Sequence, residues 1–368
     1  MHREITIHDG YDALDDLFAS FHRIFLVCGG SYRYLEIGRY LDALQNKGIE
    51  MIRFSDYAPN PTYSSVQKAV KMFQKSHCDC IVAVGGGSAM DVAKCVKLYA
   101  GITDTEDYLH KMIVQNDIPF IAVPTTAGSG SEATRFAVIY QNGNKLSIAD
   151  ESGVPSVVIF DPSVLRSLPD YQKKATMMDA FCHSIESFWS VNATEESKAL
   201  SKQAIALITD AMPAYLRGED AGCVQMLKAA NIAGKAINIT QTTAGHAMCY
   251  KLTGLYGIAH GHAAALCVGA LLSYMPAHTG DCIDPRGETY LQQTLDELAA
   301  AMQCDSPAAL SEPFHRLLHQ LGLEAPAFQE EDFAVLKNAV NSTRLKNHPI
   351  KLSPDTIEML YRRMAENR

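Results

Sequence analysis

The sequence predicts an α/β domain over residues 1–165 followed by an all-α domain over residues 166–368. Three observations carry this prediction. Short apolar runs alternate with helical patterns up to Phe160, an Asn142-Gly143 pair separates two further strand-like runs, and only long amphipathic helical patterns follow Asp161. Such alternation is typical of a parallel sheet with crossover helices. A chain of 368 residues is also long enough for two domains of the usual ~150 residues each.

The first half is predicted as a series of strands joined by helices. Strands are expected at residues 23–27, 50–54, 80–84, 119–123 and 157–160, and helices at about 34–47, 63–76 and 88–99. A further strand is expected at the N-terminus, containing His2 and His8. Because the central strands are apolar throughout, we expect both faces of the sheet to be covered. Residues 135–140 and 145–149 flank Asn-Gly, which tolerates positive φ and therefore indicates a type I′ hairpin.

Helix signals dominate the second half. Thr194 is a candidate N-cap with Glu195 and Glu196 in the first turn, Gly218 is a candidate stop, and Ser353-Pro354 starts a further helix. No low-complexity linker separates the halves, so the boundary near residues 161–172 is expected to be a change of architecture.

Composition excludes several classes of function. A formal net charge of −9 argues against a nucleic-acid or anionic-membrane partner, because the average surface field would repel either. No apolar stretch reaches the ~20 residues needed to cross a bilayer, and the N-terminus has no apolar signal segment, so we expect a cytoplasmic protein. The 10 cysteines are scattered through apolar segments, which favours reduced, mostly buried thiols.

Two glycine-containing loops follow predicted strands. The first runs from Gly85 through Gly86 and Gly87 into a helix, and the second runs from Thr125 to Glu132 after the next strand. Glycines let a ligand approach the backbone, and free N–H groups at a helix N-terminus attract phosphate. Two ordinary tight turns are the alternative, because the first loop lacks the third glycine of the usual dinucleotide fingerprint. Open α/β sheets bind ligands at this carboxyl edge.

Four polar residues lie in apolar helical segments of the second half. Asp179 and His183 are four residues apart and share one helix face, while His246 and His260 lie in a later glycine-bearing segment. One carboxylate with three imidazoles suits Fe²⁺ or Zn²⁺ better than Ca²⁺ or Mg²⁺. Each histidine alone is more simply a hydrogen-bonded core residue, and Asp179 alone an N-terminal helix charge, but four such groups together need a common reason for their place in apolar helices.

Other polar residues of this half are less specific. His262 could be a fourth imidazole ligand, an acid/base group or a substrate contact. Glu186 could orient the His183 ring, although a helix charge facing solvent is the favoured interpretation. Surface positions are expected for the histidines outside these motifs, which are His22, His77, His110, His278, His315, His319 and His348.

Taken in order, the motifs resemble those of the iron-containing (group III) alcohol dehydrogenase family. They are Gly85-Gly86-Gly87-Ser88 with Asp91 and Lys94, Pro124-Thr125-Thr126 with Gly128-Ser129-Gly130-Ser131-Glu132, Asp179-Ala180 with His183, and His246 with His260-Gly261. The resemblance covers most of the chain. It implies a Rossmann-like dinucleotide-binding domain with a hairpin, followed by an all-α metal-binding domain, and a homodimer or larger homo-oligomer.

The resemblance also implies roles for individual residues. Its metal ligands fall on Asp179, His183, His246 and His260, with Fe²⁺ expected first and Zn²⁺ as the alternative. The candidate cofactor-binding residues for NAD or NADP are Gly29, Gly30, Gly86, Gly87, Ser88, Asp91, Thr125, Thr126, Ser129 and Lys145. The candidate catalytic residues are His262, Tyr250 and Lys251.

Three departures from the family pattern bear on specificity. No Asp follows the first long strand at Gly29, and Arg33 is close by in sequence, so NADPH is at least as plausible as NADH. Tyr250 replaces a histidine that is thought to relay protons, which leaves His262 or water for that role. Residues 238–262 look most like the phosphonoacetaldehyde reductase (hydroxyethylphosphonate dehydrogenase) branch, where Lys251 would suit an anionic head group unless it is an ordinary surface lysine.

The implied activity is metal-dependent hydride transfer between NAD(P)H and a small aldehyde, with phosphonoacetaldehyde as the best candidate. Succinic semialdehyde, lactaldehyde and butyraldehyde are the alternative substrate types. A lyase of the dehydroquinate synthase type is a less favoured alternative, since it normally has Glu at the position of Asp179. A non-catalytic nucleotide-binding regulator would be expected to have lost metal ligands that this chain retains.

Overall fold

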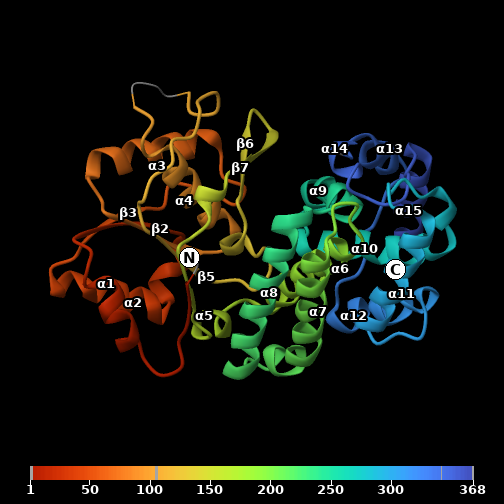
Figure 1. The fold of residues 1–368 in the computed structure, drawn as a ribbon, viewed down its shortest axis with the longest axis horizontal. Coiled ribbons are helices and arrows are strands. Elements are labelled where there is room, and N and C mark those ends of the chain that lie inside the picture. Colours follow the sequence, from red (N-terminus) through yellow and green to blue (C-terminus); the bar gives the residue numbers. More distant parts are fainter. Residues whose placement is uncertain (1–2, 104–106, 341, 367–368) are drawn as a thin grey trace. The chain divides into compact units, whose positions relative to one another are not determined.

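The computed structural model describes residues 3–103, 107–340 and 342–366. The chain divides into two compact units, one of Met1–Leu168 with Arg217–Asn231, the other of Pro169–Leu216 with Ile232–Arg368. In Figure 1 the strands and helices up to α5 run from red to yellow-green, and the later helices run on to blue. The predicted α/β first half and helical second half are confirmed.

A parallel sheet of six strands forms the centre of the first unit, in the order β1-β8-β5-β4-β2-β3. Its strands are β1 (Arg3–Thr6), β2 (Arg23–Cys28), β3 (Glu50–Phe54), β4 (Cys80–Gly85), β5 (Phe120–Pro124) and β8 (Val157–Phe160). The helices of this unit are α1 (Asp15–Phe18), α2 (Glu36–Ala43), α3 (Tyr63–Ser76), α4 (Gly87–Tyr99) and α5 (Ser163–Arg166). Every residue of β4 and β5 is buried, as their apolar sequences predict.

The predicted hairpin is confirmed as β6 (Phe136–Gln141) and β7 (Asn144–Ala149). Asn142 and Gly143 form its turn with φ of 51° and 77°, the positive values that a type I′ turn requires. Because the turn needs only these two residues, Gln141 and Asn144 pair with each other and each strand extends one residue closer to the turn than the sequence predicts.

Two local predictions in this unit need correction. The helix expected at about 34–47 begins only at Glu36, because Leu35 adopts an extended backbone with ψ of 142°, and after α2 it continues as a 3₁₀ turn at Leu44–Lys47. The N-terminal strand ends at Thr6, so His8 lies beyond it. His2 lies outside the described residues.

The second unit is built from long helices. They are α6 (Asp170–Trp189), α7 (Glu195–Leu216), α8 (Asp220–Thr240), α9 (Ala244–Tyr256), α10 (His260–Tyr274), α11 (Glu288–Ala301), α12 (Ser311–Leu321), α13 (Glu330–Asn338), α14 (Ser342–Leu345) and α15 (Pro354–Glu366). Thr194 Oγ1 accepts the Ser197 N–H at 3.1 Å, and Ser353 Oγ accepts the Thr356 N–H at 3.1 Å, as the capping pattern predicts. Helix α10 is buried along almost its whole length and packs on α6 and α9.

The segment Arg217–Asn231 joins the first unit although it lies among the helical patterns of the second half. Arg166 makes a two-pronged ion pair with Asp220, at 2.7 Å and 2.6 Å, and Asn231 Nδ2 donates to Glu132 Oε1 at 3.3 Å. These contacts attach the first half of α8 to the α/β unit. Among the described residues, no helix combines the length and the apolar character needed to span a bilayer.

Candidate metal centre and dinucleotide-binding loops

Helix α6 presents three polar side chains on one face. Asp179, His183 and Glu186 are spaced by four and then three residues, which places them on successive turns of the same face. All three side chains are buried. Burial of charged or polar groups costs free energy unless partners compensate, so the residues that other helices bring to this face determine what the site can do.

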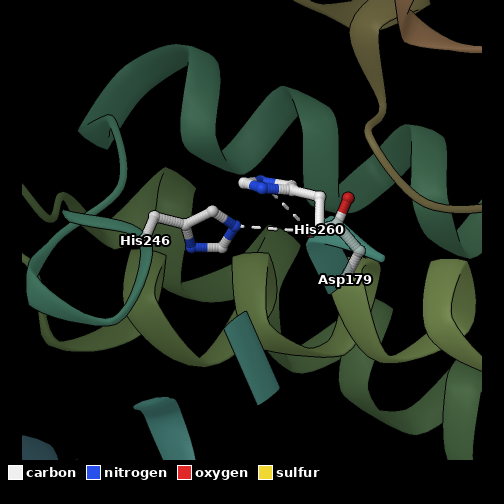
Figure 2. A group of neighbouring side chains, drawn as sticks. All are labelled: Asp179, His246 and His260. Carbon is white, nitrogen blue, oxygen red and sulfur yellow. Dashed lines mark hydrogen bonds and ion pairs between the residues drawn. The ribbon is translucent and has the colours of Figure 1, made fainter. Parts of the chain in front are cut away.

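Two histidines at helix N-termini meet Asp179. His246 lies in the first turn of α9, and its Nε2 is 3.4 Å from Asp179 Oδ1. His260 begins α10, and its Nε2 is 3.9 Å from the same oxygen. Figure 2 shows a dashed line from each of the two imidazole rings to the Asp179 carboxylate. One ligand atom from each of the three residues lies within 4.8 Å of the other two, which is the spacing of a shared cation.

Close packing of α10 on α6 produces this arrangement. A Cβ atom at Gly261 would lie 2.0 Å from the Ala175 carbonyl oxygen and 2.7 Å from Asp179 Cβ. Only glycine leaves room for this contact between the two helices. Because His260 precedes Gly261, the contact also sets the distance between the His260 ring and Asp179.

The three residues fit a divalent transition metal. One carboxylate oxygen with two imidazole nitrogens is a donor set that suits Fe²⁺ or Zn²⁺, and catalytic sites of this type keep a position open for substrate. The side chains of Asp179 and His246 are 8% and 2% exposed, whereas that of His260 is 42% exposed. The site is therefore enclosed on two sides and accessible on the side of His260.

The charges of the cluster are complementary. Burial alone would raise the pKa of Asp179, but the neighbouring His183, His246 and His260 hold it well below its usual range. Burial likewise opposes protonation of His246, yet Glu186 and Asp179 raise its pKa to about 9. Without a cation, His246 is therefore protonated at neutral pH, and a metal that binds its Nε2 must displace that proton.

Glu186 differs from its predicted role. Its side chain is 0% exposed, so the expectation of a solvent-facing helix charge is wrong. Oε1 accepts the Thr243 hydroxyl at 2.6 Å and the Gly245 N–H at 2.8 Å, and Oε2 accepts His246 Nδ1. The free N–H groups at the start of α9 compensate the buried charge. The ring that Glu186 holds by a hydrogen bond is thus that of His246, while its effect on His183 is electrostatic.

His183 lies next to the three-residue cluster. Its ring stacks on that of His246 with 4.5 Å between centroids, and its Nε2 is 4.0 Å from Asp179 Oδ1. Its role as a fourth ligand remains a prediction. The sequence did not indicate Cys249 as a residue of the site, but its Sγ lies 3.6 Å from Nδ1 of His260. Only its position three residues after His246 in a helix could have indicated this.

The predicted catalytic residues occupy three different environments. The Tyr250 ring stacks on that of His260, 5.6 Å between centroids, and Lys251 is exposed on α9. His262 is buried and donates from Nε2 to the Glu324 carbonyl at 3.0 Å, while its Nδ1 accepts the Tyr171 hydroxyl at 3.0 Å. Burial lowers the pKa of His262. Both of its ring nitrogens are thus engaged within the helical unit.

One of the histidines expected at the surface is in the core. His348 is fully buried, and its ring packs edge-on against Trp189 with 6.0 Å between centroids. Burial lowers its pKa to about 4. The expectation is wrong because His348 lies in an irregular segment, where no periodicity shows which side chains face inward.

In the first unit, the two glycine loops lie side by side. They follow β4 and β5, which are neighbours in the sheet, and the Thr125 N–H donates to the Gly85 carbonyl at 3.0 Å. A Cβ atom on Gly86 would lie 3.1 Å from Thr126 Oγ1, and one on Gly87 would lie 3.2 Å from Ser129 Oγ. The loops therefore form one continuous surface at the carboxyl edge of the sheet.

A third glycine pair lies at the same edge. Gly29 and Gly30 follow β2, and β2 lies between β3 and β4, so the order of strands reverses at β2. Open α/β sheets bind dinucleotides in the crevice at such a reversal. Ser88 lies in the first turn of α4 and accepts the Asn60 N–H at 3.3 Å. Arg33 is exposed, with its guanidinium 4.7 Å above the Tyr34 ring.

Asp91 is linked through Ser131 to a buried lysine, Lys94, behind these loops, and Lys145 acts on Asp91 electrostatically. Lys94 Nζ donates to Ser131 Oγ at 3.1 Å and to the Phe136 carbonyl at 2.6 Å, and the Ser131 hydroxyl donates to Asp91 at 3.2 Å. Burial raises the pKa of Asp91 to about 6 even though Lys94 and Lys145 oppose this change. Asp91 thus helps to hold the second loop in place, and its contact with a cofactor remains a prediction.

Comparisons with known proteins agree with this geometry. The pattern described as iron-containing alcohol dehydrogenase matches residues 5–162, and the C-terminal pattern of the Fe-containing alcohol dehydrogenase family matches residues 173–365. Phosphonoacetaldehyde reductase of Streptomyces viridochromogenes is 31% identical over 320 residues, 83% of this chain and 81% of that protein. 1,3-Propanediol dehydrogenase of Citrobacter freundii is 32% identical over 330 residues, 84% of each chain.

A solved structure shows the same fold over the whole chain. The crystal structure of sulfoacetaldehyde reductase from Bifidobacterium kashiwanohense in complex with NAD⁺ has a TM-score of 0.85 and 26% sequence identity. The match covers 100% of this chain and 98% of that protein.

Proposed function

Because the chain belongs to the iron-containing alcohol dehydrogenase family and is an NAD(P)-dependent oxidoreductase, we propose that it reduces a small aldehyde with an anionic head group. Phosphonoacetaldehyde, which would yield 2-hydroxyethylphosphonate, is the best candidate. Two observations support this choice. Residues 238–262 resemble the corresponding branch of the family, and the similar proteins include reductases named for phosphonoacetaldehyde and for sulfoacetaldehyde.

The cluster of Asp179, His246 and His260 carries the proposal. When bound, a divalent cation, Fe²⁺ first and Zn²⁺ as the alternative, supplies Lewis acidity toward the carbonyl oxygen, and the nicotinamide supplies the hydride. Asp179 and His246 would hold the cation from the enclosed side of the site. His260 would hold it at the accessible side, where the aldehyde would enter.

Residues next to the cluster would position the substrate and its proton. Tyr250 stacks on His260, which gives it a better position for proton delivery than His262, whose ring nitrogens are both engaged. Lys251 is five residues after His246 on α9, which is about 140° around a regular helix. Its long side chain would therefore have to bend toward the site to reach an anionic head group.

Dinucleotide binding is assigned to residues 1–165, and metal and substrate binding to residues 166–368. Three loops support the first assignment, namely Gly29-Gly30, Gly86-Gly87-Ser88 and Thr125 to Ser129, because each follows a strand at the carboxyl edge of the sheet. Gly29 offers no carboxylate to repel a 2′-phosphate, so both NADH and NADPH are proposed as donors. A homodimer or larger assembly is part of the proposal.

A substrate comparison tests the proposal. Metal-loaded protein is assayed with phosphonoacetaldehyde, sulfoacetaldehyde, succinic semialdehyde, lactaldehyde and butyraldehyde, each with NADH and with NADPH, by following oxidation of the nicotinamide. We expect kcat/KM for phosphonoacetaldehyde to exceed that for neutral butyraldehyde by at least about tenfold, the effect of a single favourable ionic contact. Equal or higher kcat/KM for the neutral aldehyde contradicts the proposed substrate class.

A further inference from the structure

We propose that Glu186 is a positioning residue of the metal centre, which fixes the His246 ring for metal binding and links it through Thr243 to Trp189. The inference rests on the metal site of the proposed function but not on the identity of the aldehyde. Among the described residues, Glu186 forms hydrogen bonds with His246 but not with Asp179 or His260, the other two members of the cluster. His246 is therefore the member of the cluster that Glu186 orients by hydrogen bonding.

The contacts of the His246 ring specify its protonation pattern on metal binding. Nδ1 faces Glu186 Oε2, and Nε2 faces Asp179 Oδ1 at 3.4 Å. An ionised carboxylate can only accept hydrogen bonds, so Nδ1 must carry a proton. In the neutral ring, Nε2 then has its lone pair free and directed toward the cluster. A carboxylate in this position also increases the basicity of the ligating nitrogen.

The Glu186 carboxylate is itself held in place. Its Oε1 accepts the Gly245 N–H at 2.8 Å, the Thr243 N–H at 3.1 Å and the Thr243 hydroxyl at 2.6 Å. A Cβ atom at Gly245 would lie 3.0 Å from Oε1 and 2.6 Å from Val268 Cγ2, so glycine is needed for this close approach. Glu186 therefore cannot turn away from His246 without disrupting the first turn of α9.

A hydrogen-bond chain connects this carboxylate to the one tryptophan of the sequence. The Thr243 hydroxyl donates to Glu186, and it accepts the indole N–H of Trp189 at 2.9 Å. Trp189 is 1% exposed, so its emission reports on its internal partners and not on solvent. Metal binding at His246 changes the charge that Glu186 faces, and we expect the emission of Trp189 to change with it.

The test measures metal affinity and not activity. Full-length protein is stripped of metal and titrated with Zn²⁺ against a competing chelator, with Trp189 fluorescence recorded in parallel. Glu186→Gln keeps the side-chain shape but removes the charge, and we expect metal affinity to fall by about 10- to 100-fold. The midpoint of the fluorescence change should shift by the same factor. Zn²⁺ is suitable because it has a filled d shell and no redox chemistry.

Asp284→Asn is the matched control. Asp284 is also a buried carboxylate of the helical unit, but it binds Arg286 and contacts no residue of the cluster. We expect its metal affinity to stay within about twofold of the wild-type value. Equal losses in Glu186→Gln and Asp284→Asn would overturn the inference, because they would indicate a general effect of losing a buried charge.

The remaining outcomes separate this inference from the proposed function. Wild-type affinity in Glu186→Gln would overturn the inference alone, whereas failure of the wild-type protein to bind Zn²⁺ would overturn the metal site as well.

If Glu186→Gln does not fold, Thr243→Val replaces it, since valine removes only the bridging hydroxyl. We expect Thr243→Val to weaken metal binding and to reduce the fluorescence change. Unaltered affinity and fluorescence in that variant would also overturn the inference.

Discussion

His348 is a neutral histidine in the core of the helical unit, and this makes it sensitive to acid. Burial lowers its pKa to about 4 from the ordinary value of 6.5, against a smaller opposing effect of Glu186. Between these two values, the unfolded chain binds a proton at this residue and the folded chain does not. The contribution of His348 to stability is therefore intact above pH 6.5 and is lost progressively as the pH falls toward 4.

His348→Phe should reduce the acid sensitivity of the metal-free protein. Lowering the pH from about 7.5 to about 5 should cost the wild type about 2 kcal/mol through His348, and this loss should be absent in the variant. His246 has a raised pKa and acts in the opposite direction, but it does so in both proteins and cancels from the comparison. Urea unfolding followed by circular dichroism measures the difference. Parallel pH dependence in the two proteins would show that His348 is not the group responsible.

The sequence identified the residues of the metal cluster more successfully than the residues that surround the cluster. Asp179, His246 and His260 stand out in the sequence because polar groups are rare in apolar helices, and the structure brings them together. Glu186 could not be placed, because its burial depends on N–H groups that a different helix supplies. The same limit applies to His348, whose ring packs against Trp189, far away in the sequence.

At the level of elements, the metal site depends on how closely α6 and α10 approach. Gly261 is the contact point, and any larger residue there would collide with the α6 backbone at Ala175. His260 is the neighbouring residue, so a displacement of α10 moves a metal ligand directly. Helix packing and metal geometry are in this way controlled by the same glycine.

Gly261→Ala should therefore impair metal binding as well as stability. We expect overpacking to cost about 1–3 kcal/mol of stability and metal affinity to fall by at least about tenfold, as the His260 ring moves away from Asp179. Gly254→Ala is the control, because Gly254 lies in α9 with no atom near its would-be Cβ. That variant should keep its metal affinity and be neutral or slightly more stable. Chelator competition and thermal unfolding measure both quantities, and normal affinity in Gly261→Ala would exclude this role for the helix contact.

Element patterns predicted the fold well and its interruptions poorly. The strands at 80–84 and 157–160 and the helix at 63–76 follow directly from apolar runs and periodicity, and the structure contains them. The helix expected at 34–47 begins two residues later because Leu35 is extended, and no breaker residue at that position indicates it. Periodicity records which positions are apolar but not where the backbone changes conformation.

At the scale of the molecule, the two predicted functions fall in different units. All three residues of the metal cluster belong to the second unit, and all three glycine loops belong to the first. The sequence did not predict that Arg217–Asn231 joins the first unit, because helical periodicity shows that a helix has a buried face but not what covers it. The Arg166–Asp220 ion pair that attaches this segment joins residues far apart in the chain.

The central claim is that a cation held by Asp179, His246 and His260 is required for aldehyde reduction. The direct measurement is the rate of aldehyde-dependent NAD(P)H oxidation by metal-stripped and Fe²⁺- or Zn²⁺-restored protein, for the wild type and for His260→Ala, with dinucleotide binding titrated separately. We predict that restored wild type regains turnover, that His260→Ala stays at least about 10³-fold slower, and that all forms bind the dinucleotide with similar affinity. Substantial turnover in His260→Ala, or in the wild type without a metal, would contradict the claim.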